Sequence, residues 1–402
     1  MYLQLLRRNR DFRLLYAGTL ISLGGDWFLT VALLDLVLQL TGSATLASVM
    51  LLCQTLPIFF FTAHAGHLVD RVDRRKLMII VDVARMGACL LPLFARTPAM
   101  LPFAYAGVIL ISIGSAYFEP AAQAALPNIV SGDELGPANV LMGSTWGTML
   151  AVGAAIGGAV TMRFGRDASF LVDALSFLFS AWLLWRIRAR FSEARQREHP
   201  PLRESIRETV QYAKTHPRVL ALLTCKGGYG TGAGVVAMLS VFGREVFRAG
   251  AWGIGLLFAA RGLGALIGPF LVRGVLRRDE SQYRAIVACI IAFGAGYAGL
   301  ALSKTLTLGL LSIFFAHLGG GAAWQISNYG LQRETPDHIR GRVFSVDYGF
   351  VTLTMALSSL AAGLLADRFG PVMATVGTAA VCVVFAVIWG VATWPLFAAK
   401  SN

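Results

Sequence analysis

The sequence predicts an all-helical membrane protein with twelve transmembrane helices arranged as two related six-helix halves. Of its 402 residues, 56% are hydrophobic and only 14% are charged, whereas soluble globular proteins carry about 25% charged residues. The apolar residues occur in runs of about twenty, long enough to cross a hydrocarbon core of ~30 Å. A long polar segment separates the first six runs from the last six. These three observations together indicate a chain that crosses the membrane many times.

The twelve expected spans follow one another with short polar turns between them. The first follows Arg7, Arg8 and Arg10, and it is too long for the apolar core of a signal peptide. We therefore expect it to remain as the first span rather than to be removed. By their apolar character the spans are placed at residues 12–40, 44–68, 77–95, 99–126, 137–161, 168–187, 219–243, 252–272, 285–303, 305–330, 343–366 and 371–394.

Lysine and arginine are distributed unevenly between the two sides of these spans. With the N-terminus inside, 25 of the 35 lie in inside segments, 7 lie in outside loops, and three (Arg85, Lys226 and Arg261) lie within spans. Cytoplasmic loops of membrane proteins carry such an excess. We therefore expect both termini in the cytoplasm, and we attribute the net charge of +13 to topology rather than to nucleic-acid binding.

The polar segment divides the chain into an N-terminal bundle (1–190), a cytoplasmic linker (191–218) and a C-terminal bundle (219–402). Residues 205–214 of the linker have the pattern of a short amphipathic helix that lies on the membrane surface. The halves also echo each other, as in Phe164-Gly165 and Phe369-Gly370. Parallel six-span repeats are typical of transporters that open alternately to the two sides; chance similarity between apolar helices is the alternative.

The loop after the second span carries the most specific motif. Residues 66–76 read GHLVDRVDRRK, which resembles the loop 2–3 signature of the major facilitator superfamily, Gly-x-Leu-x-Asp-Arg-x-x-Arg-Arg-Lys. The resemblance implies the two pseudo-symmetric six-helix bundles of that fold, with Asp70 facing the N-terminal end of the eleventh span. An ordinary positively charged loop is the alternative. The residues of the implied conformational latch are Gly66, Asp70, Arg71, Arg74 and Arg75.

Three further stretches, LTGSA (40–44), YFEPA (117–121) and RGRVFS (340–345), are similar to the drug:proton antiporter-3 branch, which includes macrolide efflux proteins and the enterobactin exporter. This resemblance implies a secondary active transporter that exports an amphipathic small molecule in exchange for protons. We also expect a protein that works as a monomer in a bacterial-type plasma (inner) membrane. The alternative is a lysophospholipid transporter, which is similar around the fourth span. A remote alternative is an intramembrane enzyme that acts on lipid.

A glycine-rich stretch in the fifth span, GAAIGG (153–158), resembles the antiporter signature Gly-Pro-x-x-Gly-Gly of the superfamily. Ala154 stands where the proline belongs. Gly153, Gly157 and Gly158 therefore have two interpretations of equal weight. They are either an antiporter motif or small residues that let helices pack closely.

In the superfamily fold, spans one, four, seven and ten line the central cavity. Each carries an ionisable residue, namely Asp26, Glu119, Lys226 and His317. Such residues are costly inside a membrane and are by default functional-site hypotheses. Asp26, Glu119 and His317 are the proton-coupling candidates, with structural pairing as the alternative. Lys226 could pair with a carboxylate across the two halves or hold an anionic substrate group.

Helical spacing places further polar residues on the same faces as these four groups. In the first span Thr19, Ser22, Asp26 and Thr30 step by three or four residues. Polar stripes on apolar helices are expected to face water or protein rather than lipid. The substrate-cavity candidates taken from the stripes are Ser22, Thr30, Ser115, Gln123, Lys226, Tyr229, Trp324, Gln325 and Asn328.

The remaining charged residues of the spans are expected to be structural. Asp82 and Arg85 are three residues apart and should pair. Asp173, Arg261 and Asp347 lie on spans that should not face the cavity centre. The sequence contains no phosphate-binding loop and no metalloprotease or serine-hydrolase motif. We therefore predict no catalytic residue, metal or cofactor, and partners limited to protons, the lipid bilayer and a small amphipathic substrate or lysolipid.

Overall fold

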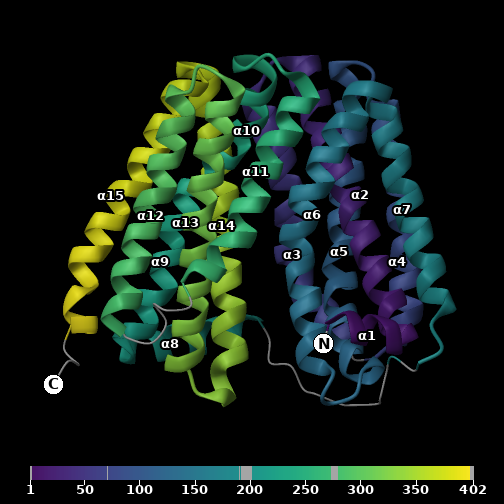
Figure 1. Cartoon of the computed structure of the whole chain (residues 1–402), viewed down its shortest axis with the longest axis horizontal. Coiled ribbons are helices and arrows are strands. Elements are labelled where there is room, and N and C mark those ends of the chain that lie inside the picture. The colour runs from purple at the N-terminus through teal and green to yellow at the C-terminus, as the bar shows by residue number, and fades with distance from the viewer. Residues whose placement is uncertain (1, 70, 190, 192–201, 273–278, 399–402) are drawn as a thin grey trace. The chain divides into compact units, whose positions relative to one another are not determined.

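The computed structural model describes residues 2–69, 71–189, 191, 202–272 and 279–398, and nearly all of them lie in helices (Figure 1). Eleven helices in this part of the chain are long and apolar enough to cross a membrane. The predicted all-helical membrane fold is therefore confirmed.

The chain divides into two compact units, and two helices are shared between them. Unit 1 comprises Met1–Gly42, Cys53–His199 and Gly250–Ala259, and unit 2 comprises Ser43–Leu52, Pro200–Ala249 and Ala260–Asn402. Helix α3 (Ala44–Val69) therefore begins in unit 2 and ends in unit 1, whereas α11 (Gly250–Leu271) begins in unit 1 and ends in unit 2. Because of this exchange, the expected bundle boundaries at residues 190 and 218 stay a prediction.

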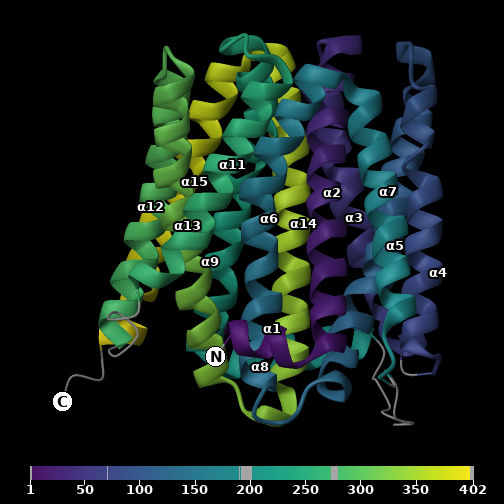
Figure 2. The ribbon, with the colours of Figure 1, turned by 45° about the vertical axis from the view of Figure 1, so that its right-hand side comes forward.

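In unit 1, α2 packs against α6 and α7, and α4 packs against α5 and α7 (Figure 2). The core contains Phe12, Met78, Phe118 and Leu184, each at most 3% exposed. Two short 3-10 turns, Leu91–Phe94 and Pro98–Met100, join α4 to α5. The helices are α1 (Tyr2–Arg8), α2 (Arg10–Thr41), α4 (Arg74–Ala88), α5 (Leu101–Ile129), α6 (Leu135–Phe164) and α7 (Arg166–Arg186).

Local sequence signals explain where several of these helices begin and end. Asn9 caps α2, because its side-chain oxygen accepts a hydrogen bond from the Phe12 N–H at 2.9 Å. Asp73 caps α4 in the same way through the Lys76 N–H at 3.0 Å. Helices α6 and α14 end alike, at Gly165 and Gly370, each with φ +84°. That backbone conformation favours glycine, and it gives a structural counterpart to the Phe-Gly echo between the halves.

In unit 2, α12 packs against α13 and α15, and α9 packs against α14 and α15. Helix α8 covers the segment expected to be an amphipathic surface helix. Part of the predicted linker, residues 192–201, lies outside the described residues. The helices are α8 (Leu202–Thr215), α9 (Pro217–Ala233), α12 (Asp279–Leu302), α13 (Leu306–Glu334), α14 (Asp337–Phe369) and α15 (Pro371–Ala398).

The seventh expected span is interrupted rather than continuous. Helix α9 is followed by a 3-10 turn (Gly234–Ala237), the single turn α10 (Met238–Val241) and a π-helical turn (Phe242–Val246). Glycine disfavours helix by about 1 kcal/mol relative to alanine, and the end of α9 is rich in it. A Cβ on Gly234 would lie 2.2 Å from the backbone of Ser358, so α14 fixes the chain at the break. This interrupted segment, together with the eleven long helices, accounts for the predicted twelve.

Candidate functional site

A cluster of ionisable residues surrounds Arg85 inside unit 1. The Arg85 guanidinium pairs with the Asp82 carboxylate, so the predicted pairing is confirmed. Both side chains are at most 4% exposed. A second guanidinium nitrogen donates to the Ser115 hydroxyl at 3.3 Å. The guanidinium carbon also lies 4.5 Å from the Phe118 ring centroid and 4.3 Å from that of Phe177. Arg85 is thus held by one carboxylate, one hydroxyl and two aromatic rings.

Asp26 on α2 and Glu119 on α5 belong to the same cluster. Asp26 is half-buried and Glu119 is exposed. In the part of the chain that the structure describes, neither side-chain carboxyl makes a hydrogen bond or an ion pair. Both are nevertheless under the electrostatic influence of Arg85. The charged groups that act on Asp26 are Asp173, Arg85, Glu119 and Asp82.

Asp173 on α7 also belongs to this cluster, although the sequence predicted that its span would not face the cavity centre. It is fully buried, and its carboxylate accepts hydrogen bonds from the Cys89 thiol at 3.1 Å and the Ser176 hydroxyl at 3.2 Å. The spacing of Ser169, Asp173, Ser176 and Ser180 follows the same three-and-four rule as the stripe around Asp26, and all four are buried. That pattern could have identified Asp173, had the sixth span been considered as part of the site.

The structure also places the uncharged cavity candidates of unit 1. Ser22 and Thr30 on α2 are buried, at 3% and 5% exposure. The Thr30 hydroxyl accepts a hydrogen bond from the Gln54 amide at 2.9 Å. On α5, Ser115 binds Arg85, whereas Gln123 is exposed. Ser115 therefore belongs to the cluster around Arg85, as Asp26 does. Gln123 has an exposed side chain instead.

In unit 2, Lys226 on α9 forms a buried ion pair with Asp347 on α14. Both side chains are 3% exposed. The Lys226 ammonium also donates to the Asn328 side-chain oxygen at 2.6 Å and lies 4.7 Å from the Trp324 ring centroid. This partner differs from the expected carboxylate in the N-terminal half. Helices α9 and α14 pack against each other, and this packing places Asp347 beside the ammonium.

A second buried contact in unit 2 joins His317 to Tyr297. The Tyr297 hydroxyl lies 2.7 Å from Nε2 of His317, and both residues are at most 1% exposed. Phe293 packs on both rings and on Tyr229, with the Tyr229 and Phe293 centroids 4.8 Å apart. His317 is thus held in an aromatic cluster. Tyr297 was missed because an isolated tyrosine in an apolar span carries no sequence signal.

Two of the remaining unit 2 candidates, Tyr229 and Trp324, line a small cavity beside Lys226. Its lining includes Lys226, Tyr229, Trp324 and Ser327. The cavity measures about 10 Å³, which is room for about one water molecule. Gln325 is exposed and does not line this cavity. In this structure, the Lys226 ammonium therefore contacts other protein groups and does not face an open space large enough for a substrate.

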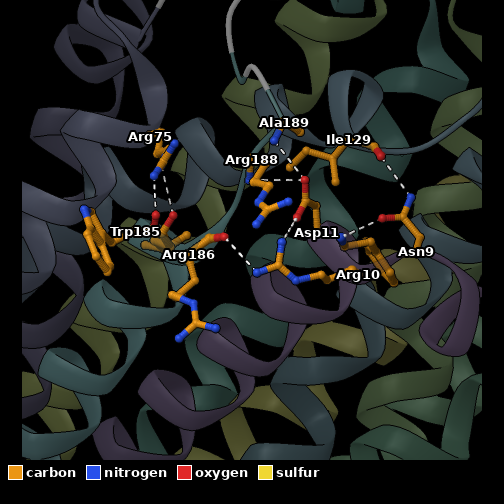
Figure 3. Close-up of polar contacts among 11 residues, drawn as sticks. Asn9, Arg10, Asp11, Arg75, Ile129, Trp185, Arg186, Arg188 and Ala189 are labelled. Atoms are coloured by element: carbon orange, nitrogen blue, oxygen red, sulfur yellow. Dashed lines mark hydrogen bonds and ion pairs between the residues drawn. The ribbon is translucent and has the colours of Figure 1, made fainter.

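The arginines of the predicted latch bind backbone carbonyl groups within unit 1. Arg74 donates to the carbonyl oxygens of Ala124 at 2.8 Å and Phe191 at 3.1 Å. Arg75 donates to those of Leu184 at 3.0 Å and of Trp185 (Figure 3). Arg71 is exposed. Asp70 lies outside the described residues, as do the surroundings of Gly66, so the latch stays a prediction.

Figure 3 also shows how the start of α2 is attached to the end of α7. The Asp11 carboxylate accepts hydrogen bonds from the Arg188 N–H at 3.2 Å and the Ala189 N–H at 2.8 Å. Arg10 donates to the Arg186 carbonyl oxygen at 3.3 Å. Together with Arg75, these contacts tie the ends of α2, α4 and α7 to one another at a single end of unit 1.

The glycines of the antiporter-like motif lie where α6 meets neighbouring backbones. A Cβ on Gly153 would lie 3.0 Å from the Gly24 carbonyl oxygen, and one on Gly157 would lie 2.8 Å from the Phe28 Cα. A Cβ on Gly158 would lie 2.7 Å from the Ala251 carbonyl oxygen. All three glycines therefore permit close helix packing. An additional role in antiport stays a prediction.

Replacing Gly158 with alanine should destabilise the protein, because a backbone carbonyl cannot move aside as a flexible side chain can. We expect a loss of about 1–3 kcal/mol, measured as a lower melting temperature of the detergent-solubilised protein. Gly143→Ala is the matched control on the same helix, since its Cβ would meet nothing within 4 Å. An equal melting temperature for the two variants would contradict the packing role.

The known proteins that this chain resembles in sequence or in fold are membrane transporters. A family profile described as a transmembrane secretion effector matches residues 6–401. The multidrug efflux pump Tap of Mycolicibacterium fortuitum is 27% identical over 89% of both chains. Macrolide efflux protein A of Streptococcus pyogenes is 23% identical over 89% of this chain and 90% of its own. A bacterial homologue of the human lysosomal transporter Spinster shares the fold, with a TM-score of 0.77 and 16% identity over 97% of this chain and 98% of its own.

Proposed function

The chain belongs to the transmembrane secretion effector family of major facilitator transporters, and from this premise we propose that it exports an amphipathic small molecule from the cytoplasm in exchange for protons. The efflux activity named for its relatives supports the direction of transport. Family and relatives are transporters rather than enzymes. Alternating access is the mechanism that two six-helix halves favour.

The observation that carries the proton-coupling proposal is the excess of carboxyl groups around Arg85. Four of them, including Asp26 and Glu119, share the electrostatic environment of this one guanidinium. Arg85 already pairs with Asp82, which leaves Asp26 and Glu119 without an ion-pair partner among the described residues. Keeping uncompensated charges within a membrane is costly. A proton that binds one of these carboxyls removes a charge, and this provides a way to couple proton movement to conformation.

Asp26 is the preferred proton carrier in this proposal, and Glu119 is the preferred contact for substrate. The exposed Glu119 and Gln123 lie four residues apart on α5 and so share one helix face. A carboxylate and an amide beside apolar residues suit a ligand with a polar or cationic end and a hydrophobic body. We propose that His317, enclosed by aromatic rings and bonded to Tyr297, has a secondary role in coupling.

The orientation proposed for the transporter has both termini in the cytoplasm of a cell with a bacterial-type inner membrane. The basic residues support this choice, because most of the Lys and Arg outside the spans lie on one expected side. We propose that one chain suffices for transport, as the twofold repeat supplies both halves of an alternating-access device.

Transport by the purified protein in liposomes tests the proposal. The probes are ethidium, erythromycin and a fluorescent lysophosphatidylethanolamine, each with and without an imposed pH gradient. We expect ethidium or erythromycin to accumulate in an acidic lumen and to be released when a protonophore is added. Movement of the lysolipid alone, independent of the gradient, would favour the alternative of a lysophospholipid transporter. Equal accumulation of every probe with and without the gradient would contradict proton antiport.

A further inference from the structure

The Gly-x-Leu-x-Asp-Arg pattern of the predicted latch occurs a second time in the chain. Residues 66–71 read GHLVDR at the end of α3, and residues 363–368 read GLLADR near the end of α14. The glycine, leucine, aspartate and arginine have the same spacing in both copies. In the expected topology, the first copy lies on the cytoplasmic side and the second on the opposite side.

The second copy contacts the beginning of α3. The Asp367 carboxylate accepts hydrogen bonds from the Ser43 hydroxyl at 2.7 Å, the Ala44 N–H at 2.7 Å and the Thr45 N–H at 3.1 Å. Two of these donors are backbone groups of the first turn of α3, which have no partner within the helix itself. A carboxylate at a helix N-terminus also interacts favourably with the helix dipole. Asp367 therefore caps a helix that is distant in sequence.

Gly363 brings the two helices close enough for this contact. A Cβ at this position would lie 2.5 Å from the Ser48 hydroxyl oxygen, 2.8 Å from the Thr45 Cα and 2.9 Å from the Ala44 carbonyl oxygen. Gly363 lies four residues before Asp367, on the same face of α14. Gly363 and Asp367 therefore both contribute to the contact between α14 and the start of α3. The first copy of the pattern has a glycine and an aspartate at the same spacing.

Helix α3 is continuous but belongs to both units. Its first residues, up to Leu52, group with unit 2, which contains α14, and its residues from Cys53 onward group with unit 1. We propose that Asp367 is a positioning residue in the transport cycle. It holds the start of α3 on the end of α14 and thereby stabilises the state that is closed on the extracytoplasmic side. This inference rests on the alternating-access function proposed above.

The carboxylate must release its three donors before the start of α3 can move away with the rest of its helix. Hydrogen bonds to charged groups are among the stronger ones in proteins, so the contact can bias an equilibrium between closed and open states. Asp70 is predicted to make the corresponding contact on the other side, and with both contacts each of the two helices would cap the start of the other.

Distances between spin labels in lipid nanodiscs test this inference without substrate or a proton gradient. The labels are placed on cysteines at Phe164, the last residue of α6, and Leu302, the last residue of α12, which are 71% and 75% exposed. The five native cysteines are replaced, and the background protein is required to keep its fold. We expect Asp367→Asn to raise the ratio of long to short distances about tenfold relative to the parent. Asp367→Glu should restore part of the short-distance population.

Arg368→Gln is the matched control, since it removes a neighbouring charge whose guanidinium carbon lies 5.3 Å from the Phe369 ring centroid. It should leave the distances unchanged. If Asp367→Asn does not fold, Ser43→Ala removes one donor to Asp367, together with the acceptor of the Leu46 N–H at 3.2 Å, and should give a smaller shift in the same direction. Unchanged distances in the folded variants would overturn the inference. Because this readout needs no transport, it is independent of whether the exporter proposal succeeds.

Discussion

Replacing Asp26 with asparagine should abolish the dependence of transport on a proton gradient. Asparagine keeps the size of the side chain but binds no proton, so the cycle loses the group that we propose to link proton and substrate. We expect the Asp26→Asn variant to equilibrate ethidium across a liposome membrane without concentrating it. The measurement compares accumulation at an imposed pH gradient with accumulation at equal pH on both sides.

The matched control is Asp133→Asn, an identical change at an exposed carboxylate of the same half. Ser131 donates a hydrogen bond to Asp133 at 2.8 Å, and this contact holds the pKa of Asp133 below its ordinary value. Asp133 is therefore ionised at neutral pH and outside the proposed site. We expect the control to concentrate ethidium like the parent. Normal gradient-driven accumulation by Asp26→Asn would remove Asp26 from the mechanism.

Replacing Lys226 with methionine should strongly destabilise unit 2. The change removes the cation and leaves the Asp347 carboxylate 3% exposed with no ion-pair partner in the described part of the chain. Breaking a buried ion pair by removing one partner costs about 3–5 kcal/mol. We expect a large fall in the melting temperature and in the yield of folded protein. Asp347→Asn should have a similar but smaller effect, because the Lys226 ammonium keeps its contacts with Asn328 and Trp324.

Two controls test whether the loss of stability comes from the buried Asp347 carboxylate that is left without its partner. In the double variant Lys226→Met with Asp347→Leu, both charges are replaced by apolar groups, and stability should largely return. Arg96→Gln breaks the pair with Asp167, whose side chains are 57% and 47% exposed, and it should cost only about 0–1 kcal/mol. A double variant as unstable as Lys226→Met would show that the buried charge is not the cause.

Much of the fold could be predicted from the sequence because membrane helices carry a strong local signal. Long apolar runs and a single polar stripe on the first span led to α2 and to Asp26. The pairing of Asp82 with Arg85 followed from their spacing on one helix. The superfamily was predictable for a different reason, since residues 66–76 match its loop signature at every defined position.

The features that could not be predicted depend on contacts between helices distant in sequence. The partner of Lys226 is Asp347, 121 positions along the chain, and no local pattern relates the two. The break after α9 depends on the close approach of Ser358 to Gly234. The division of α3 and α11 between the units is likewise a property of packing, because apolar helices of similar composition do not encode in their own sequence which neighbour they contact.

The most direct test of proton-coupled export is to measure whether substrate efflux alone drives protons into liposomes. Liposomes that contain the protein are loaded with ethidium and a pH-sensitive dye, and then diluted into buffer of the same pH. Ethidium carries a permanent charge and takes up no proton itself, so its exit alone neither binds nor releases a proton in the lumen. We predict that the lumen becomes acidic as ethidium leaves, in parent liposomes but not in those with Asp26→Asn. Ethidium efflux through the parent protein at constant internal pH would contradict proton-coupled export.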